Sequence, residues 1–297
     1  MQGPTTPAPA ADLVSLVICT RNRADRLSNC FAALRALTRR CEWEIVVVDN
    51  GSTDGTRAVV ERFADEFDSP VHYAFQAKPG LGGARNAGVQ KAAGKIIGFT
   101  DDDCYVSPSF VDDVCDSFAR NPKLGFVGGR VLLHDPTDYP ITIQERHDCV
   151  AIEPGSFVPA GLIHGANFSF RRAALEAAGG FDEMFGAGTF YACEDVDMLA
   201  RIVGLGWHGT YDPHPTVAHH HGRKTQRDAD RLIRVYDYGR GAYYMKSLLN
   251  PRLRLVYLRH WYWRVRKQPL PCSLREFYAA LRYLPHAALV RASGHRG

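Results

Sequence analysis

The chain has 297 residues, of which 45% are hydrophobic and 23% charged, with a formal net charge of +4. This composition is typical of a globular protein with one large domain and an appendage, and it argues against a fibrous or broadly disordered chain. The eight cysteines are scattered without a C-x-x-C pair, so the sequence favours a reducing cytoplasm over a disulfide framework or zinc knuckles.

The chain opens on a Pro/Ala/Thr-rich stretch, residues 1–12, which predicts a disordered tail. The stretch has no Lys or Arg and lacks the apolar centre of a signal peptide, so export by that route is not expected. The sequence contains no run of 18 uncharged apolar residues, which argues against a membrane span.

The first hundred residues alternate short apolar runs with helical periodicity. We expect strands at 13–19, 44–49, 71–75 and 95–100. We expect one helix at 27–37, a second that begins after an N-cap at Thr53 or Asp54, and a third at 81–93. Such alternation predicts an α/β fold, with a mainly parallel sheet flanked by helices and ligands at the carboxyl ends of the strands.

Beyond residue 108 the alternation weakens. We expect a helix at 110–118, a strand at 124–133, a loop-rich excursion at 134–157, a strand at 165–171, and helices at 172–178 and 194–203. After residue 223 the pattern is helical and aromatic. No internal repeat is visible.

Three consecutive carboxylates, Asp101, Asp102 and Asp103, follow the apolar run 96–100 at the point where its strand should end. Adjacent carboxylates repel one another unless a cation or hydrogen-bond donors relieve them. Asp101 and Asp103 point the same way if the backbone stays extended. We therefore favour a divalent metal site over a solvated acidic turn.

Two further segments carry chemistry. Residues 80–88 are rich in glycine and allow close approach of the backbone to a ligand, but no G-K-[S/T] follows, so a P-loop ATPase is not supported. The pair Glu194 and Asp195 opens a predicted helix, where negative charge is favourable in any case. On its own this pair would not indicate catalysis.

The last 75 residues are strongly basic. Residues 223–297 contain 17 Lys and Arg against 4 Asp and Glu, a balance of +13, whereas residues 1–222 carry −9. Such a segment favours an anionic partner: lipid headgroups, a phosphate-bearing acceptor or nucleic acid. Because Trp and Tyr alternate with the basic residues between 252 and 267, we favour a membrane surface and expect no nucleic acid.

Five segments occur in a recognisable order: 20–23, 48–54, 80–88, 101–103 and 194–197. In this order and spacing the chain resembles the family 2 inverting glycosyltransferases of the GT-A fold, over about residues 13–222. The order and separate spacing of these motifs make the resemblance specific. It implies a catalytic domain at 13–222, with a nucleotide-binding half at 13–107 and an acceptor half at 108–222, followed by a basic helical segment at 223–297.

The resemblance also implies residue roles. The donor nucleotide would be bound by Thr20, Arg21, Asp49, Lys78, Arg85, Asp101 and Asp102. Among these, Thr20 and Asp49 would contact the base, since a carboxylate suits the N3 proton of uracil or thymine. Lys78 and Arg85 would approach the diphosphate, and Asp102 the ribose.

The metal and the base follow from the same resemblance. Asp101, Asp103 and His219 would hold Mn²⁺ or Mg²⁺, with His219 preferred over His220 and His221 because it fits the V-x-H pattern. Asp195 would be the general base that deprotonates the acceptor, and Glu194 would orient the acceptor or its loop.

The expected activity is therefore a metal-dependent, inverting transfer of a sugar from a UDP- or dTDP-sugar to a hydroxyl of a glycan or lipid-linked acceptor. The expected location is cytoplasmic, or peripheral on the inner face of the cell membrane. A nucleotidyltransferase is disfavoured because residues 20–23 contain no glycine, and a non-catalytic nucleotide- or polysaccharide-binding module because it has no need of Asp195.

Overall fold

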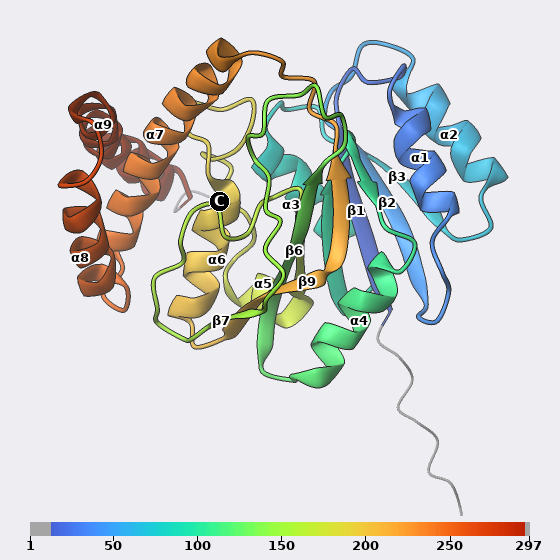
Figure 1. Ribbon diagram of the computed structural model, residues 1–297, viewed down its shortest axis with the longest axis horizontal. Helices are drawn as coiled ribbons and strands as arrows, with labels where there is room; N and C mark the ends of the chain where they lie inside the picture. Colours follow the sequence, from blue (N-terminus) through green and yellow to red (C-terminus); the bar gives the residue numbers. More distant parts are fainter. Residues whose placement is uncertain (1–12, 295–297) are drawn as a thin grey trace, which may run out of the picture.

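The computed structural model describes residues 13–294, with side chains to 289. The predicted tail at 1–12 and the last three residues lie outside the described part of the chain. Figure 1 shows a central sheet between layers of helices, with the C-terminal helices at one side. The strands of the first half are β1 Val14–Thr20, β2 Trp43–Asp49, β3 Val71–Phe75 and β4 Ile96–Asp101, and the helices are α1 Leu27–Arg35, α2 Thr56–Glu66 and α3 Leu81–Lys91.

The first four strands form a parallel array in the order β3-β2-β1-β4. The inner strand β1 is buried on both faces, which explains its continuous apolar sequence. In the register, Thr20 lies opposite Asp49, and Cys19 lies opposite both Val48 and Asp101. The carboxyl ends of the strands therefore bring Thr20, Asp49 and Asp101 to one edge of the sheet.

The second half completes a nine-stranded sheet among the described residues. Its elements are β5 Cys104–Val106, α4 Phe110–Arg120, β6 Leu124–Leu133, β7 Val150–Ile152, β8 Asn167–Arg171, α5 Arg172–Ala177, α6 Glu194–Gly204 and β9 His208–His219. β8 runs antiparallel to β4 and β6, while β9 is parallel to β6 and antiparallel to β5 and β7. The predicted α/β sheet flanked by helices is confirmed, with parallel pairing through β4 and mixed pairing beyond it.

Three local predictions need correction. Helix α2 begins at Thr56 with Gly55 at its N-cap, so neither Thr53 nor Asp54 caps it in the expected position. The Asp54 carboxylate instead accepts hydrogen bonds from the Thr56 and Ala24 backbone N–H groups at 3.0 and 3.2 Å. The excursion at 134–157 contains the short strand β7, and the sequence pattern did not reveal β5 or the first part of β9.

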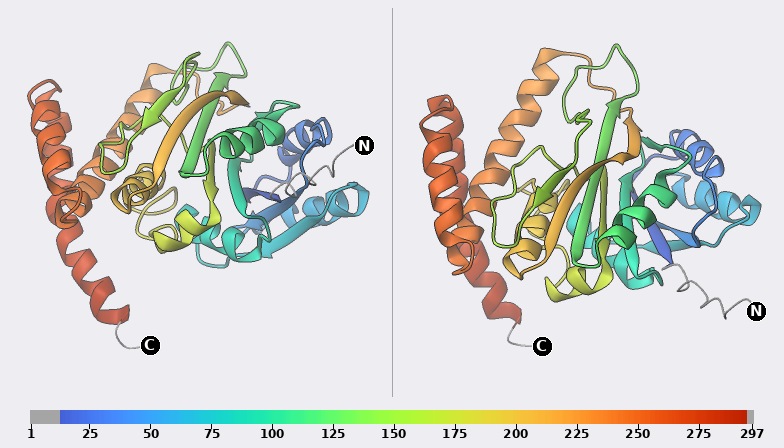
Figure 2. Two further views of the ribbon diagram at one scale, coloured as in Figure 1. Left: turned by 90° about the horizontal axis from the view of Figure 1, so that it is seen from below. Right: turned by 60° about the horizontal axis from the view of Figure 1, so that its bottom comes forward.

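The C-terminal helices are α7 Gln226–Leu249, α8 Arg254–Val265 and α9 Leu270–Gly294, and the two views of Figure 2 show α8 and α9 on the outer side of α7. They share one buried acid, Glu276, which is 0% exposed. Its carboxylate accepts hydrogen bonds from Arg240 of α7 at 2.8 Å and from the Trp261 indole of α8 at 2.9 Å. The predicted helical C-terminal segment is confirmed.

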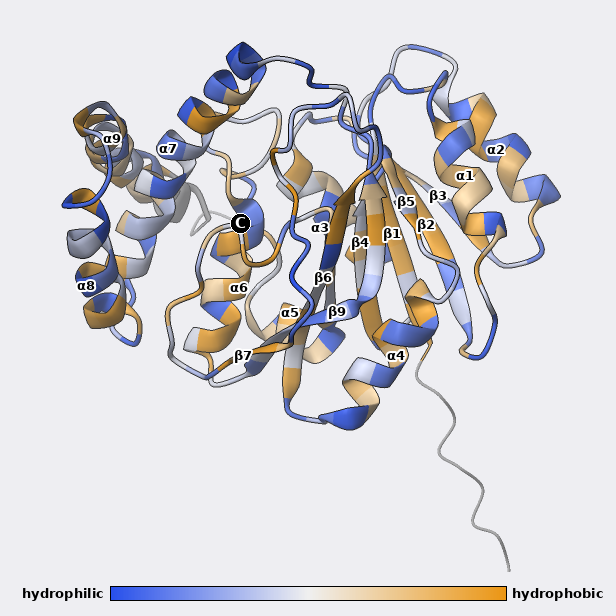
Figure 3. Ribbon diagram, viewed as in Figure 1, coloured by the Kyte–Doolittle hydropathy of each residue, from blue (hydrophilic) through white to orange (hydrophobic). Residues whose placement is uncertain are grey.

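Helix α8 is only partly used for packing. Leu253, Tyr257 and Trp261 are buried in a cluster with α7 and α9, whereas Leu258 and Trp263 remain exposed. In Figure 3, hydrophobic colours follow the strands of the sheet, and α8 and α9 carry hydrophobic and hydrophilic residues side by side. In the described part of the chain, every helix is too short or too polar to span a bilayer.

Candidate active site

A cleft of about 330 Å³ lies at the carboxyl ends of β1 and β4. Its lining comes from the strand ends, α3, the 164–166 segment, the start of α6, the end of β9 and helix α7. A second hollow of about 250 Å³ adjoins it and shares residues such as Arg23, Leu81 and Asp102 with it. The two hollows together offer room for an elongated ligand.

The end of β4 and the end of β9 meet at the floor of the cleft. Strand β5 follows the aspartate triplet at once and pairs with β9 so that Cys104 lies opposite His219. This register brings Asp103 beside His219, with Oδ1 3.4 Å from Nε2. Asp102 turns toward β1 and accepts a hydrogen bond from the Thr20 hydroxyl at 2.7 Å.

The three consecutive histidines have different surroundings. His219 faces Asp103 in the cleft. The His220 ring packs against Tyr105, whose hydroxyl lies 3.0 Å from His220 Nδ1. His221 is buried, with Nδ1 3.5 Å from an oxygen of Asp138. His219 is therefore the histidine that shares a site with the aspartate triplet.

The carboxylates at the cleft floor differ in how far neighbouring protein groups stabilise their charge. Burial, reinforced by the neighbouring Asp103, raises the pKa of Asp101 to about 7, although Arg85 acts in the opposite direction. Burial would also raise the pKa of Asp103, but the hydrogen bond and charge of His219 lower it below its ordinary value. A cation between these groups would relieve the repulsion that Asp101 experiences.

The donor set fits a hard divalent ion. Asp101, Asp103, Cys104 and His219 each offer one ligand atom, and these atoms lie within 4.8 Å of one another. Burial raises the pKa of the Cys104 thiol well above its usual range, and a soft sulfur is in any case a poor match for a hard, oxygen-preferring ion. Two carboxylates and an imidazole remain, a combination suited to Mn²⁺ or Mg²⁺.

A second cluster of acidic residues is neutralised by a lysine side chain. Asp135 and Asp138 lie with His220 in a similar arrangement. The Lys224 ammonium is 2.6 Å from Asp135 and 2.7 Å from Asp138. This group therefore anchors the segment that leads into α7.

Arg85 and Glu194 form a buried pair in the cleft wall. Arg85 is 2% exposed, and its guanidinium donates to Glu194 at 2.7 Å and to the Gly165 carbonyl at 3.1 Å, with Asp101 3.7 Å away. The guanidinium also lies 4.8 Å from the centre of the Phe168 ring. Arg85 therefore connects the first acid of the E-D pair to the aspartate triplet.

Asp195 lies at the start of α6 and lines the cleft. Its two carboxylate oxygens accept hydrogen bonds from the backbone N–H groups of Gly165 and Val196, at 3.0 and 2.8 Å. Burial raises the pKa of Asp195, against the opposing charge of Arg85. The residue two before it, Cys193, adopts a left-handed conformation with φ of 76°. This turn places the first residues of α6 at the cleft.

Some of the residues predicted to bind the nucleotide line the second hollow, and others lie outside it. Thr20 and Arg21 line the second hollow, as does Asn50. Asp49 is buried and accepts hydrogen bonds from the Ser52 N–H at 2.8 Å and the Tyr73 hydroxyl at 3.0 Å. Lys78 is exposed and pairs with Glu183 at 3.2 Å. Neither Asp49 nor Lys78 lines the two hollows.

Several lining residues were not selected from the sequence. Arg23 is 4.0 Å from Asp102 and 3.9 Å from Asp103, and it belongs to the predicted loop after the first strand. Arg223 and the α7 residues Leu232 and Tyr236 also line the cleft. Arg23 lies within the motif segment 20–23, so its sequence position could have identified it. The α7 residues have no local signal, because only long-range packing brings them to the site.

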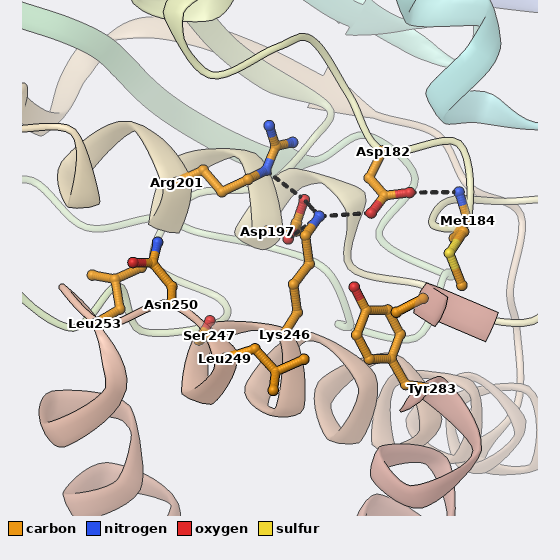
Figure 4. Close-up of a pocket in the computed structure, with 11 residues that line it drawn as sticks. Asp182, Met184, Asp197, Arg201, Lys246, Ser247, Leu249, Asn250, Leu253 and Tyr283 are labelled. Carbon is orange, nitrogen blue, oxygen red and sulfur yellow. Dashed lines mark hydrogen bonds and ion pairs between the residues drawn. The ribbon is translucent and has the colours of Figure 1, made fainter. Parts of the chain in front are cut away.

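Another cavity, of about 390 Å³, lies away from the cleft, between α6, α7 and α9. Figure 4 shows Lys246 of α7 reaching between Asp182 and Asp197, with Arg201 on the other side of Asp197. Burial would raise the pKa of Asp197, but Arg201 and Lys246 lower it below its ordinary value. The charged groups around this cavity pair with one another, and the ion pair between Lys246 and Asp197 connects α7 to α6.

Comparisons with known proteins fit this geometry. The model of the family described as "Glycosyl transferase family 2" matches residues 15–179, more than half of the chain. The N-acetylglucosaminyl-diphospho-decaprenol L-rhamnosyltransferase of Mycobacterium tuberculosis is 28% identical over 253 residues, covering 73% of this chain and 79% of that protein. Glycosyltransferase AglE of Haloferax volcanii is 26% identical over 247 residues, covering 82% and 77%.

Solved structures share the fold. Mannosyltransferase PcManGT from Pyrobaculum calidifontis, in complex with GDP-Man and Mn²⁺, superposes with a TM-score of 0.65 at 19% identity, covering 100% of this chain and 80% of that one. TarS from S. aureus, in complex with UDP-GlcNAc, gives a TM-score of 0.64 at 16% identity, covering 90% and 79%. At these identities the likeness establishes the fold alone.

Proposed function

Because the chain belongs to glycosyl transferase family 2 and is a glycosyltransferase with a GT-A fold, we propose that it moves a sugar from a UDP- or dTDP-sugar to an acceptor hydroxyl by single displacement with inversion. The observation that carries the proposal is the placement of Asp195 in the same cleft as Asp101, Asp103 and His219. One carboxylate opposite a leaving-group site is what a single displacement requires.

The donor would occupy both hollows. Its base and ribose would lie in the second hollow, beside Thr20, Arg21 and Asn50. Asp49 would reach the base from below or act by holding the turn at Ser52, with which it already forms a hydrogen bond. The diphosphate would lie toward the shared wall, where Arg23 supplies positive charge.

A divalent metal would be held by Asp101, Asp103 and His219. When bound, it supplies positive charge that stabilises the departing nucleoside diphosphate. The protein's own contribution at this end is positional: β5 and β9 hold Asp103 and His219 in register, and Arg85 partly balances Asp101.

Asp195 would accept the proton of the acceptor hydroxyl as that oxygen attacks the anomeric carbon. The two backbone N–H groups hold its carboxylate in one orientation. Glu194, bound to Arg85, would fix the start of α6 and so the position of Asp195. Here the catalytic domain is residues 13–222, and α7 adds Leu232 and Tyr236 to the acceptor side.

A lipid-linked acceptor is the class we favour. The Mycobacterium tuberculosis relative acts, by its name, on an N-acetylglucosaminyl-diphospho-decaprenol, and the basic C-terminal helices of this chain suit an anionic surface. The enzyme would then work at the inner face of the cell membrane.

The donor is tested by a thermal-shift screen of UDP-, dTDP- and GDP-sugars with and without Mn²⁺, followed by assignment of the product's anomeric configuration by NMR. A UDP- or dTDP-sugar should raise the melting temperature most, and the product should have the opposite anomeric configuration to the donor. Stabilisation by GDP-sugars alone would exclude the donor class, and retained configuration would exclude single displacement.

Removal of the metal should abolish transfer. Excess chelator is expected to stop activity, and added Mn²⁺ to restore it, because the leaving diphosphate would otherwise carry its charge without relief. His219→Ala should raise the Mn²⁺ concentration required about tenfold or more. His220→Ala is the matched control, since its ring packs on Tyr105 instead of the triplet. Undiminished activity in chelator would show the metal assignment to be wrong.

A further inference from the structure

The outer faces of α8 and α9 expose large apolar side chains. On α9, Leu270, Leu274, Phe277, Leu281 and Leu284 recur at spacings of four and three residues, so they form one stripe along the helix. Leu281 is 67% exposed and Leu274 58%, and Leu255 of α8 is 78% exposed. Single exposed leucines are common, but a continuous stripe indicates a surface that meets an apolar environment.

The charge around this stripe has one sign. Between residues 251 and 289 the sequence has eight Lys and Arg but one acid, Glu276. Glu276 is fully buried between the helices, where it pairs with Arg240 and Arg264, so it does not offset the charge of more exposed residues such as Arg259 and Lys267. Arg259, Arg266 and Lys267 are exposed, and the Arg266 guanidinium lies over the exposed Tyr262 and Trp263 rings.

Aromatic side chains connect the stripe to the mouth of the cleft. Val235 of α7 lines the cleft and is itself exposed. One turn further on, Tyr238 packs against Phe190 and Tyr278, with ring centres 5.8 and 6.1 Å apart. Tyr278 is adjacent to Leu274 and Leu281 on α9. The exposed apolar surface thus continues from the active-site cleft to the outer face of α9.

We propose that this surface, formed by the stripe on α9, the outer face of α8 and the aromatic bridge at Phe190 and Tyr238, docks onto an anionic lipid bilayer. Arg and Lys pair with headgroup phosphates, Trp and Tyr lie at the interface, and leucines enter the acyl boundary. The bridge then brings the cleft to the lipid surface. This placement rests on the lipid-linked acceptor of the proposed function, but the docking does not depend on it.

A second copy of the chain is the competing occupant, because a stripe with heptad spacing also suits helix pairing. Pairing two such faces would bring two sets of unbalanced positive charges together, since the surface has no exposed acid between 251 and 289. An anionic bilayer supplies the missing negative charge. The charge pattern therefore favours the membrane.

The test is co-sedimentation of the full chain with phosphatidylglycerol-containing and pure phosphatidylcholine vesicles, at low and high salt. Binding is expected with the anionic vesicles and should weaken at high salt. Leu274→Glu with Leu281→Glu should reduce vesicle affinity about tenfold or more. Arg259→Gln with Lys267→Gln should weaken binding and its salt dependence without touching the apolar stripe.

The matched control adds the same two negative charges elsewhere, with Ala58→Glu on α2 and Gln90→Glu on α3, both exposed; it should bind like the unaltered protein. The proposal would be overturned if the Leu274/Leu281 variant bound vesicles as well as the unaltered protein, or if the unaltered protein did not bind anionic vesicles. A dimer in light scattering that this variant converts to monomer, or preferential binding to single-stranded RNA, would also overturn it. Vesicles without donor or acceptor measure docking alone, so a failed transfer assay leaves this result intact.

Discussion

Replacing Asp195 with asparagine should lower turnover by on the order of 100-fold or more while leaving donor affinity nearly unchanged. The amide cannot accept the acceptor's proton, and the hollow proposed for the donor's base and ribose, beside Thr20 and Asn50, does not include residue 195. The measurement is steady-state transfer together with donor binding followed by calorimetry. Asp68→Asn, at an exposed surface position, is the matched control and should behave like the unaltered enzyme.

The asparagine variant also needs a stability measurement. Both oxygens of Asp195 accept backbone N–H groups, so an amide NH₂ would face one of those donors. We expect a loss of about 1–3 kcal/mol in the free energy of unfolding, which leaves the protein folded. Near-normal transfer by a folded Asp195→Asn variant would exclude Asp195 as the base.

Replacing Arg85 with methionine should reduce the free energy of unfolding by about 3–5 kcal/mol. The substitution leaves Glu194 buried without its cation and removes the positive charge nearest Asp101. It also removes the guanidinium that packs against Phe168. Urea unfolding measures the loss, and the same samples give the donor affinity.

Two companion variants identify the cause. Arg85→Lys keeps the charge but not the two-pronged geometry, so its stability should be intermediate. Adding Glu194→Gln to Arg85→Met removes the unpaired charge and should recover part of the loss. If Arg85→Met leaves stability unchanged and only weakens donor binding, Arg85 serves the diphosphate instead of the buried acids.

The first half of the fold was predictable because its information is local. Strands such as β1 are buried on both faces and stand out as apolar runs, and helices such as α2 follow with regular spacing. Since parallel strands end at one edge, the meeting of Asp49 and Asp101 followed from the alternation, and the family resemblance added Thr20.

The second half depended on pairings between distant residues. Strand β9 contains Pro213 and Pro215 and several polar residues, so its pattern is weak, yet its register with β5 decides that His219 joins the triplet. The burial of Arg85 against Glu194, 109 residues later, and the arrival of Tyr236 at the cleft likewise result from tertiary packing. No local periodicity encodes such contacts.

The burial of Glu276 has a consequence for proteolysis and folding cooperativity. Its partners belong to α7 and α8, and Asp237 of α7, also fully buried, is paired with Arg275 of α9 at 2.7 Å. A chain cut before α9 would remove Glu276 and Arg275, so that Arg240 and Asp237 of α7 would keep only their pairing with each other. The last three helices should therefore resist stepwise trimming from the C-terminal side and unfold together, since detaching α9 breaks up a shared network of buried charges.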